Sequence, residues 1–532
     1  MKSSIFHHRS TIASASLILA GSALLSRLLG LFRDRLLAGY FGTGSLVDAY
    51  QISFLLPDFV YNIFIIGALS ASFIPVFLAL YAKDKKQAWD LTSRLFNLLA
   101  VSIIIILAFC FLFTPQLVSI LGKIAAATGS QYDAANLNLI VRLTRLMLLS
   151  PLILAISSLA TNVLQSLKHF LAPAISPLLY NLGIIFGILF LAPSWGIYGV
   201  AWGVIFGAVL HLLVQLPGLY NARFRYCFSW KITSEVWKVI KLSLPRTFGL
   251  AAAQANLWIN KIIAFTLGAG AVSVYYFANN LQFVPIGLFG VSLAVATFPD
   301  LAKSTNGKNK KEFIQTFSRS FRQIIYLTVP ASIIFLLLRA QIVRIILGTG
   351  AFDWQATILT ARTLGFFAIS IFAQSLVMLL ARAFYALQDS KTPVLISIVT
   401  LAVNIILALI LAPSLGVAGL ALAYSAANFI NLLVLIFVLR LKLENLDDLN
   451  IIKSSLKIIL ASFLMGAATY ASLHIIAPLV NMHKFWGIFI QASSAALIGI
   501  SVYILCTWAL KSDEIHLIAG KMKHWKNKIL IT

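Results

Sequence analysis

The chain repeats one stretch, first as Leu191-Ala-Pro-Ser-Trp-Gly-Ile-Tyr-Gly-Val-Ala201 and again as Leu411-Ala-Pro-Ser-Leu-Gly-Val-Ala-Gly-Leu-Ala421, at an offset of 220 residues. The same offset aligns three more pairs of identical residues, which are Arg142 with Arg362, Leu167 with Leu387, and Pro173 with Pro393. Each copy contains six predicted membrane spans. Because six is even, both copies have the same orientation, and we expect a pseudo-two-fold axis along the membrane normal. An old duplication kept only for packing is the alternative.

Composition predicts an all-α, polytopic membrane protein. The chain has 532 residues, of which 60% are hydrophobic and 11% are charged, whereas a soluble domain has about 25% charged residues. We find fourteen apolar segments near or above the ~20 residues that cross a hydrocarbon core. They are 11–39, 46–81, 89–114, 136–166, 171–191, 196–219, 240–267, 272–300, 320–340, 357–387, 393–411, 416–439, 452–475 and 487–510.

The repeat divides these spans into domains. We predict an N-terminal six-helix lobe in 1–222, a C-terminal six-helix lobe in 223–445, an accessory transmembrane helix pair in 446–512, and a basic cytoplasmic tail in 513–532. Prolines at matching places, Pro57 and Pro285, are expected to bend one helix in each lobe, because proline removes a backbone hydrogen bond.

The net charge of +25 follows the predicted topology. Basic residues gather in alternate loops, as with Lys83, Lys168, Lys231, Lys310 and Lys442. The positive-inside rule therefore places both termini in the cytoplasm, and it explains the charge better than nucleic-acid binding does. The three cysteines have no motif spacing, so we predict neither a disulfide framework nor a metal site.

Charged residues within the first predicted span are the main candidates for a site. Ser26-Arg27-Leu28-Leu29-Gly30-Leu31-Phe32-Arg33-Asp34-Arg35 places three arginines and an aspartate in an apolar segment. Each such charge costs roughly 2.5–3.5 kcal/mol near a bilayer centre on insertion scales, so a helix usually turns it toward a polar cavity or a partner charge. The alternative is that Arg27 or Arg35 only extends to the headgroups.

Other intramembrane polar residues extend this set. Asp48 and Asp58 lie on the second span, and Arg246 and Lys261 on the seventh. Cations outnumber anions among these groups, so we expect an anionic cargo, and a diphosphate suits paired guanidinium groups. We expect His211, alone in its span, to bond a neighbouring side chain rather than to relay protons. No enzyme motif is found, and no catalytic residue, metal or cofactor is predicted.

The motifs also resemble a known family. Ser26-Arg27-Leu28-Leu29-Gly30 with Arg33-Asp34, then Asp48-Ala49 and Leu56-Pro57, is similar to the N-terminal signature of the MurJ/MviN family of lipid II flippases. Tyr385-Ala-Leu-Gln-Asp-Ser-Lys-Thr-Pro393 resembles that family's loop between spans 10 and 11. The family belongs to the multidrug/oligosaccharidyl-lipid/polysaccharide exporter superfamily. Its members carry lipid-linked peptidoglycan precursor to the outer leaflet through a cationic central cavity.

The resemblance implies site residues and also shows departures. It implies that Arg27, Arg33 and Asp48 are needed for activity, with Ser26 and Asp34 beside them. The family usually has an arginine where this sequence has Tyr61, followed by Asn62, and an Asp-Arg pair where it has Asn279-Asn280. Arg246 and Lys261 are candidate replacements for the missing cations.

We therefore predict a lipid II flippase of a bacterial cytoplasmic (inner) membrane that works by alternating access and makes or breaks no bond. It would serve peptidoglycan and cell wall biogenesis and cell shape as a monomer, with lipid II and membrane lipid as partners, together with cell-wall synthesis proteins and without nucleic acid. The alternatives are a flippase of another polyprenyl-diphosphate-linked oligosaccharide, a drug or cation antiporter, a non-transporting scaffold, and a membrane-embedded transferase acting on the same lipid.

Overall fold

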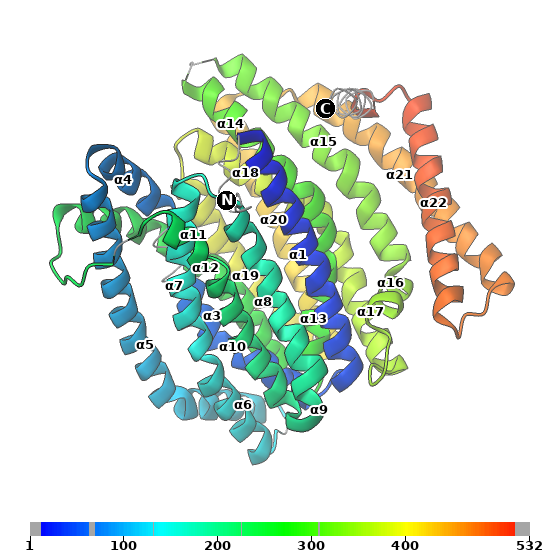
Figure 1. Cartoon of the computed structure of the whole chain (residues 1–532). Coiled ribbons are helices and arrows are strands. Elements are labelled where there is room, and N and C mark those ends of the chain that lie inside the picture. Colours follow the sequence, from blue (N-terminus) through cyan, green and yellow to red (C-terminus); the bar gives the residue numbers. More distant parts are fainter. Residues whose placement is uncertain (1–11, 63–69, 131, 225, 307–308, 516–532) are drawn as a thin grey trace, which may run out of the picture. The chain divides into compact units, whose positions relative to one another are not determined.

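The computed structural model describes residues 12–62, 70–130, 132–224, 226–306 and 309–515. For 12–17, 70–71, 242, 244–253 and 306 it describes the backbone alone. Within these ranges all regular structure is helical (Figure 1), which confirms the predicted fold class.

Backbone contacts divide the chain into two compact units. Unit 1 is Met1–Ser273 with Thr349–Phe352, and unit 2 is Val274–Gly348 with Asp353–Thr532. The helices of unit 1 are α1 (Ile12–Phe41), α2 (Ser45–Ser53), α3 (Leu55–Val60), α4 (Ser70–Lys83), α5 (Lys85–Ala127), α6 (Ala134–Met147), α7 (Leu149–Ser166), α8 (Leu171–Phe186), η3 (Gly187–Leu191), α9 (Ala192–Trp195), α10 (Ile197–Leu213), α11 (Leu216–Asn221) and α12 (Ser234–Phe265). The lobe boundaries drawn from the repeat stay predictions.

The remaining helices follow in unit 2, except that α13 begins within unit 1. They are α13 (Ala271–Pro285), η4 (Ile286–Val291), α14 (Ser292–Asn306), α15 (Lys310–Leu337), α16 (Arg339–Leu347), α17 (Trp354–Ile369), α18 (Ile371–Ala386), α19 (Lys391–Leu415), α20 (Val417–Leu443), α21 (Asp448–Ile476), η5 (Ala477–Leu479) and α22 (Phe485–Ala509).

Most of the predicted spans are present as long apolar helices. Ten helices in the described residues are long and apolar enough to cross a membrane, and the pair α17 and α18, bent by 45°, makes an eleventh. The other three predicted spans are 11–39, 46–81 and 240–267. Each includes residues or side chains outside the described part, so the total of fourteen stays a prediction.

The sequence repeat is visible in the backbone. Gly196 and Gly416, which are 220 residues apart, have φ/ψ angles of 56/−138° and 61/−141° at the starts of α10 and α20. Lys168 and Gln388, at the same offset, both adopt positive φ, 63° and 59°, after α7 and α18. Non-glycine residues seldom adopt positive φ, so the shared turns show that the two copies have the same local fold.

Glycines let α8 and α10 pack closely. A Cβ on Gly183 would lie 2.3 Å from the Cα of Gly207, and one on Gly187 would lie 2.6 Å from the Cα of Gly203. Small residues at such contacts are typical of membrane helices, where close packing rather than water drives association. The other side of α8 contacts α1, and Figure 1 shows the three helices together.

The prolines that we expected to bend helices lie at irregular places. Pro57 is in the short helix α3, which follows a break between α2 and α3 at Phe54. Pro285 ends α13, and the helix then continues as the π-helical segment η4. Both observations agree with the loss of a backbone N–H at proline.

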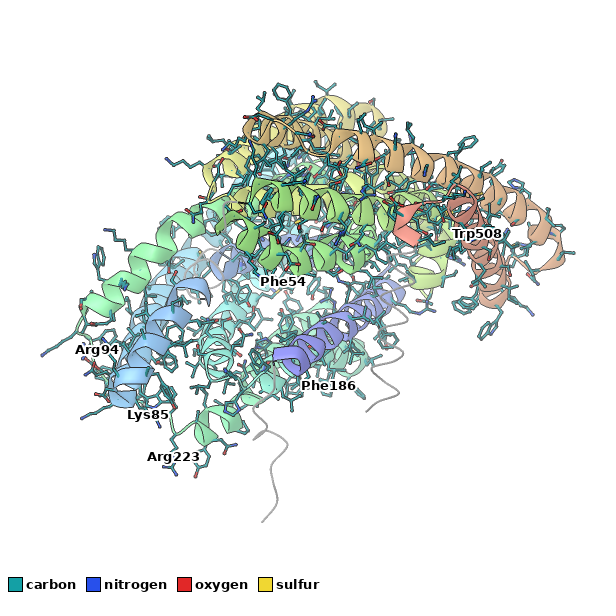
Figure 2. The ribbon with its side chains drawn as sticks, turned by 90° about the horizontal axis from the view of Figure 1, so that it is seen from above. Phe54, Lys85, Arg94, Phe186, Arg223 and Trp508 are labelled. Atoms are coloured by element: carbon teal, nitrogen blue, oxygen red, sulfur yellow. The ribbon has the colours of Figure 1, made fainter. Side chains whose placement is uncertain are left out.

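Basic residues gather at one edge of unit 1, where Figure 2 labels Lys85, Arg94 and Arg223. Arg94 bonds Asp90 at 2.7 Å, and its other terminal nitrogen donates to the carbonyl of Lys231 at 3.1 Å. The loop before α12 is thereby tied to α5. This edge carries the loops that the positive-inside rule assigns to the cytoplasm.

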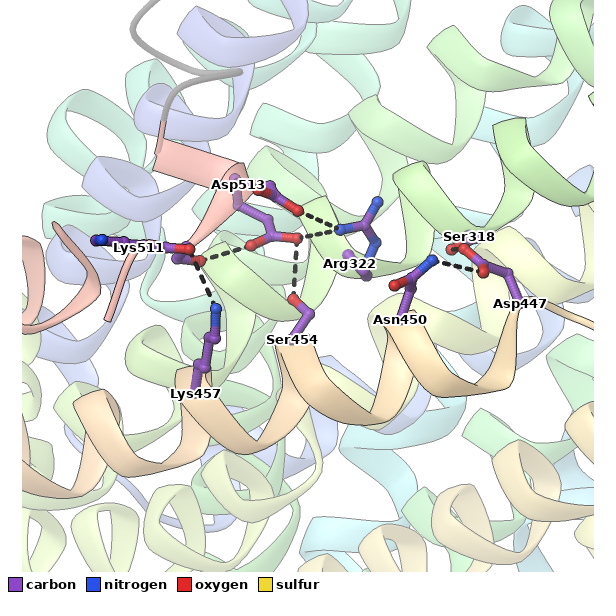
Figure 3. A network of polar contacts seen from close by, with 10 residues as sticks. Ser318, Arg322, Asp447, Asn450, Ser454, Lys457, Lys511 and Asp513 are labelled. Carbon is purple, nitrogen blue, oxygen red and sulfur yellow. Dashed lines mark hydrogen bonds and ion pairs between the residues drawn. The ribbon is translucent and has the colours of Figure 1, made fainter. Parts of the chain in front are cut away.

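Within unit 2, a polar network joins α15, α21 and the residues that follow α22 (Figure 3). Arg322 of α15 bonds the buried carboxylate of Glu514 at 2.9 Å, and Ser454 of α21 donates to the same carboxylate at 2.9 Å. Ser318 of α15 donates to Asp447 at 2.7 Å. Because Glu514 bonds both α15 and α21, these bonds fix the segment around residue 514 against both helices.

The close contact between α8 and α10 predicts that an added methyl group is destabilising at Gly183 but not at a glycine with open space around it. Gly183→Ala should lower the free energy of unfolding by about 1–3 kcal/mol, because the new Cβ meets backbone that cannot move aside. Gly21→Ala on α1 is the matched control, because no atom lies within 4 Å of its added Cβ. Thermal unfolding in detergent should show a lower Tm for the first variant alone. Equal Tm values would contradict the packing described here.

Candidate functional site

Arg33 and Asp34 form an ion pair in the C-terminal half of α1. Both Nε and Nη2 of Arg33 donate to Oδ1 of Asp34, at 3.1 and 2.8 Å. The side chain of Asp34 is 3% exposed, whereas that of Arg33 keeps 20% exposure. The pairing offsets part of the cost of burying the carboxylate, and it orients the guanidinium group while leaving it accessible.

Asn181 of α8 joins this pair to Ser26. Nη1 of Arg33 donates to Oδ1 of Asn181 at 3.1 Å, and Nδ2 of Asn181 donates to the hydroxyl of Ser26 at 3.2 Å. The structure therefore brings three predicted site residues, Ser26, Arg33 and Asp34, into one cluster. Our sequence reasoning missed Asn181, although an amide within the apolar segment 171–191 was a usable signal.

Arg27 lies on the same helix, seven residues before Asp34 and therefore about 10 Å along the axis. Its side chain is half-buried. The side chain of Arg246 is outside the described residues, so its predicted role stays a prediction.

Lys261 lies beside the second predicted span. Its ammonium group is 3.4 Å from the carbonyl of Gln51 on α2, and it interacts electrostatically with Asp58 on α3. Trp258, one turn earlier on α12, contacts Phe59 with ring centroids 4.8 Å apart. The lysine thus balances the charge of an acidic side chain at this level of unit 1.

Tyr61 and His211 line a cavity of about 340 Å³ within unit 1. Nδ1 of His211 lies 2.6 Å from the hydroxyl of Ser157, and that hydroxyl accepts a bond from Gln215 at 2.7 Å. This confirms that His211 bonds a neighbouring side chain, as the sequence predicted.

Asp48 has a different environment from the arginines. Its Oδ2 accepts from the backbone N–H of Gly270 at 2.6 Å and its Oδ1 from that of Ser273 at 2.7 Å. Tyr132, whose ring stacks on Phe265, lies 3.5 Å from the same carboxylate. Asp48 thus stabilises the beginning of α13, where N–H groups lack helical partners. Its role in substrate binding stays a prediction.

The loop at residues 349–352, which belongs to unit 1, contacts the C-terminal part of α1. The N–H of Ala351 donates to the carbonyl of Gly39 at 2.8 Å. A Cβ on Gly350 would lie 2.2 Å from the same oxygen. The contact between these two backbones therefore requires glycine at position 350, which also has a φ of +55°.

The two asparagines in place of a family ion pair belong to unit 2. Asn279 accepts a bond from Gln282 at 2.9 Å, and Gln282 in turn accepts from Gln374 at 2.9 Å. Gln374 also donates to Ser370 at 2.9 Å, the residue at the bend between α17 and α18. Asn280 is half-buried. A neutral polar network therefore runs through unit 2 at this level.

The loop that resembles the family's second motif is held by Asp389. Its carboxylate accepts from the backbone N–H and the hydroxyl of Thr392 at 3.0 and 2.6 Å and contacts the ammonium group of Lys442. Burial raises the pKa of Asp389, but the bonds from Lys442 and Thr392 outweigh burial and lower this pKa to about 2. Among the described residues no cluster of metal-binding side chains is found.

The Asp48 contacts predict a large effect on stability. Asp48→Ala should lower the free energy of unfolding by about 1.5–3 kcal/mol, because two N–H groups lose a charged acceptor. The matched control is Asp133→Ala, since Asp133 caps α6 through one exposed bond to the N–H of Asn136, at 2.8 Å. In thermal unfolding the control should change the Tm less. A drop no larger than that of the control would refute this role.

Comparisons with known proteins agree with these observations. The family model described as lipid II flippase MurJ matches residues 37–490. A lipid II flippase MurJ of Burkholderia cenocepacia is 32% identical over 437 residues, covering 80% of this chain and 83% of the relative. A probable lipid II flippase MurJ of Thermotoga maritima is 31% identical over 502 residues, covering 94% of this chain and 97% of the relative.

Solved structures share the fold. A lipid II flippase MurJ in an inward closed conformation aligns with a TM-score of 0.76 and 24% identity, covering 94% of this chain and 100% of that one. An inward-facing multidrug resistance MATE family transporter of the MOP superfamily aligns with a TM-score of 0.68 and 14% identity, covering 82% and 99%. The family match spans most of this chain and includes Asp48, Lys261 and the Asp389 loop, so the chain belongs to the MurJ family of lipid II flippases.

Proposed function

We propose that this protein is a flippase that moves lipid II from the cytoplasmic to the outer leaflet of a bacterial cytoplasmic membrane. Membership of the MurJ family and the printed names of its relatives support the activity and the cargo. The observation that carries the proposal is the group of Ser26, Arg33 and Asp34 on α1 with Asn181 on α8, which we call the arginine cluster. A guanidinium group that is oriented by Asp34 and Asn181 and is still partly exposed suits a phosphate oxygen.

In this mechanism the diphosphate of the lipid binds Arg33 and Arg27, and Lys261 and Arg246 add positive charge from α12. The polyprenyl tail stays in the lipid. Rocking of the two lobes then opens the site to the other side, as in other transporters with parallel repeats. No bond is made or broken, and the protein acts as a monomer alongside cell-wall synthesis proteins.

The membrane potential favours this direction of transport. In an inside-negative membrane, outward movement of about two negative charges gains roughly 4–5 kcal/mol at a potential of about 100 mV. The cycle therefore needs no nucleotide when the diphosphate moves without a counter-ion. With the basic loops in the cytoplasm, both termini lie there too.

Complementation tests the proposed function. The unmodified chain should restore growth to a bacterium depleted of its own lipid II flippase, and Arg33→Ala and Arg27→Ala should abolish that growth, because each removes a cation from the phosphate site. The amount of each protein in the membrane is measured by immunoblot.

The matched control for these variants is Phe32→Ala. Phe32 is next to Arg33 on α1 but is 48% exposed, so its loss should leave growth intact. Full growth with Arg33→Ala at a normal protein level would remove this arginine from the mechanism.

Cysteine labelling tests the orientation. Cys227 is exposed, so it is first replaced by serine. In that background Lys311→Cys should react only with reagents that enter the cytoplasm, and Lys484→Cys should react with an impermeant maleimide in intact cells, since both positions are exposed and belong to loops of opposite sides. The reverse pattern would overturn the topology.

A further inference from the structure

The cavity lined by Tyr61 and His211 has chemistry that the arginine cluster does not account for. Its volume is about 340 Å³, and four helical segments of unit 1 form its walls. The lining residues are Phe54, Pro57, Asp58, Tyr61, Asn62, Ser150, Pro151, Leu154, Pro177, Tyr180 and His211. They come from α3 and its two ends, α7, α8 and α10.

Helix irregularities explain why a cavity exists at this place. The break between α2 and α3 is at Phe54, and the break between α6 and α7 is at Leu148. Pro57, Pro151 and Pro177 each lack the N–H that would close a helical turn. Two breaks and a proline inside α8 thus meet around the cavity, and side chains there cannot pack as closely as those of regular helices.

The walls combine aromatic rings with neutral and acidic polar groups. Phe54, Tyr61 and Tyr180 supply rings, and none of the lining residues is lysine or arginine. Asn62 donates one N–H to the carbonyl of Asp58 at 2.9 Å, which leaves its amide oxygen and second N–H to serve the cavity. His211 uses Nδ1 at Ser157, so Nε2 is the nitrogen available to a ligand.

The cavity is also adjacent to the arginine cluster. Nδ2 of Asn181 donates to the carbonyl of Pro177, a wall residue, at 3.1 Å, and Oδ1 of the same Asn181 accepts from Arg33 at 3.1 Å. One side chain therefore connects the cavity wall to the guanidinium group. The phosphate site proposed at Arg33 and the wall of the cavity are therefore joined through the same part of α8.

We propose that this cavity holds the sugar ring that is joined to the diphosphate of the transported lipid. The inference rests on the proposed function and assigns a place to one part of its cargo. A pyranose ring offers apolar faces to Tyr61 and Tyr180, and its hydroxyl or acetamido groups match Asn62, Asp58 and His211. The volume is near the lower end of the range of about 300–1,000 Å³ for ligand pockets, so it suits one ring rather than the whole head group.

Charge separates this assignment from a second phosphate site. Lys261 is engaged with Asp58 from outside the lining, and the lining residues themselves supply no arginine or lysine that would bind a phosphate. Tyr61 supplies a ring to this cavity, and the neighbouring Asn62 supplies an amide. This part of the chain is therefore suited to a neutral ligand, beside the cationic site on α1.

The test compares two lipids that differ only in the glycan and its peptide. Native mass spectrometry of the full chain measures binding of lipid II and of undecaprenyl diphosphate, which has no sugar. We expect the unmodified chain to bind lipid II more tightly. Asn62→Leu and Tyr61→Leu should each weaken lipid II binding about five- to tenfold, because hydrogen bonds or ring contacts to the sugar are lost. Binding of undecaprenyl diphosphate should not change, which also shows that the variants are folded.

Asn428→Leu is the matched control. Asn428 is half-buried on α20 in unit 2, and its amide donates to the carbonyl four residues earlier at 2.8 Å, as that of Asn62 does. It should leave the binding of both lipids unchanged. Tyr61→Phe keeps the ring and should retain most of the lipid II affinity.

Each other outcome has a defined meaning. If the Asn62 and Tyr61 variants weaken binding of both lipids equally, or of neither lipid, the proposed sugar site is wrong. The flippase activity is then still decided by the complementation test. Equal binding of the two lipids by the unmodified chain would also refute the sugar site alone. If the unmodified chain binds neither lipid and does not complement, the proposed function fails, and the sugar site fails with it.

Discussion

The ion pair between Arg33 and Asp34 is the constraint around which this part of unit 1 is organised. An isolated charge inside a membrane helix costs several kcal/mol, and pairing with an adjacent carboxylate lowers that cost. The pair is further bonded to Asn181, so α1 has to lie against α8 at this level. The guanidinium group of Arg33 is thereby held in place while part of its surface stays accessible to a ligand.

The packing of α8 against α10 supports this arrangement. Gly183, Gly187, Gly203 and Gly207 allow the two helix backbones to touch, and such contact gives dispersion energy that lipid cannot replace. The helix that carries Asn181 is therefore held firmly on the side away from α1. On the face toward α3 and α7, prolines and helix breaks prevent equally close packing, and the cavity beside Tyr61 results. α8 is thus closely packed against α10 and loosely packed beside the cavity. The guanidinium group that Asn181 of α8 bonds therefore lies near a polar pocket.

Asp48 and Asp34 show that the same type of residue, a buried aspartate in a predicted span, can have different roles. Both Asp48 and Asp34 are buried carboxylates in predicted spans. Asp34 bonds a guanidinium group, whereas Asp48 bonds two backbone N–H groups at the beginning of α13. Sequence reasoning treated the two as one set, because a charge within an apolar segment indicates a partner without saying which one.

The sequence by itself determined the fold class, the register of the repeat and most of the spans, because apolar length and the 220-residue offset are properties of the chain alone. It also indicated Ser26, Arg33 and Asp34 as neighbours, since they share one helix. Only the tertiary structure decided that Asn181 joins them, that Lys261 interacts electrostatically with Asp58, and that Tyr61 and His211 line one cavity. These partners lie on different helices, from 148 to 203 residues apart along the chain. The helix breaks and glycine contacts that bring them together leave no fixed spacing in a sequence.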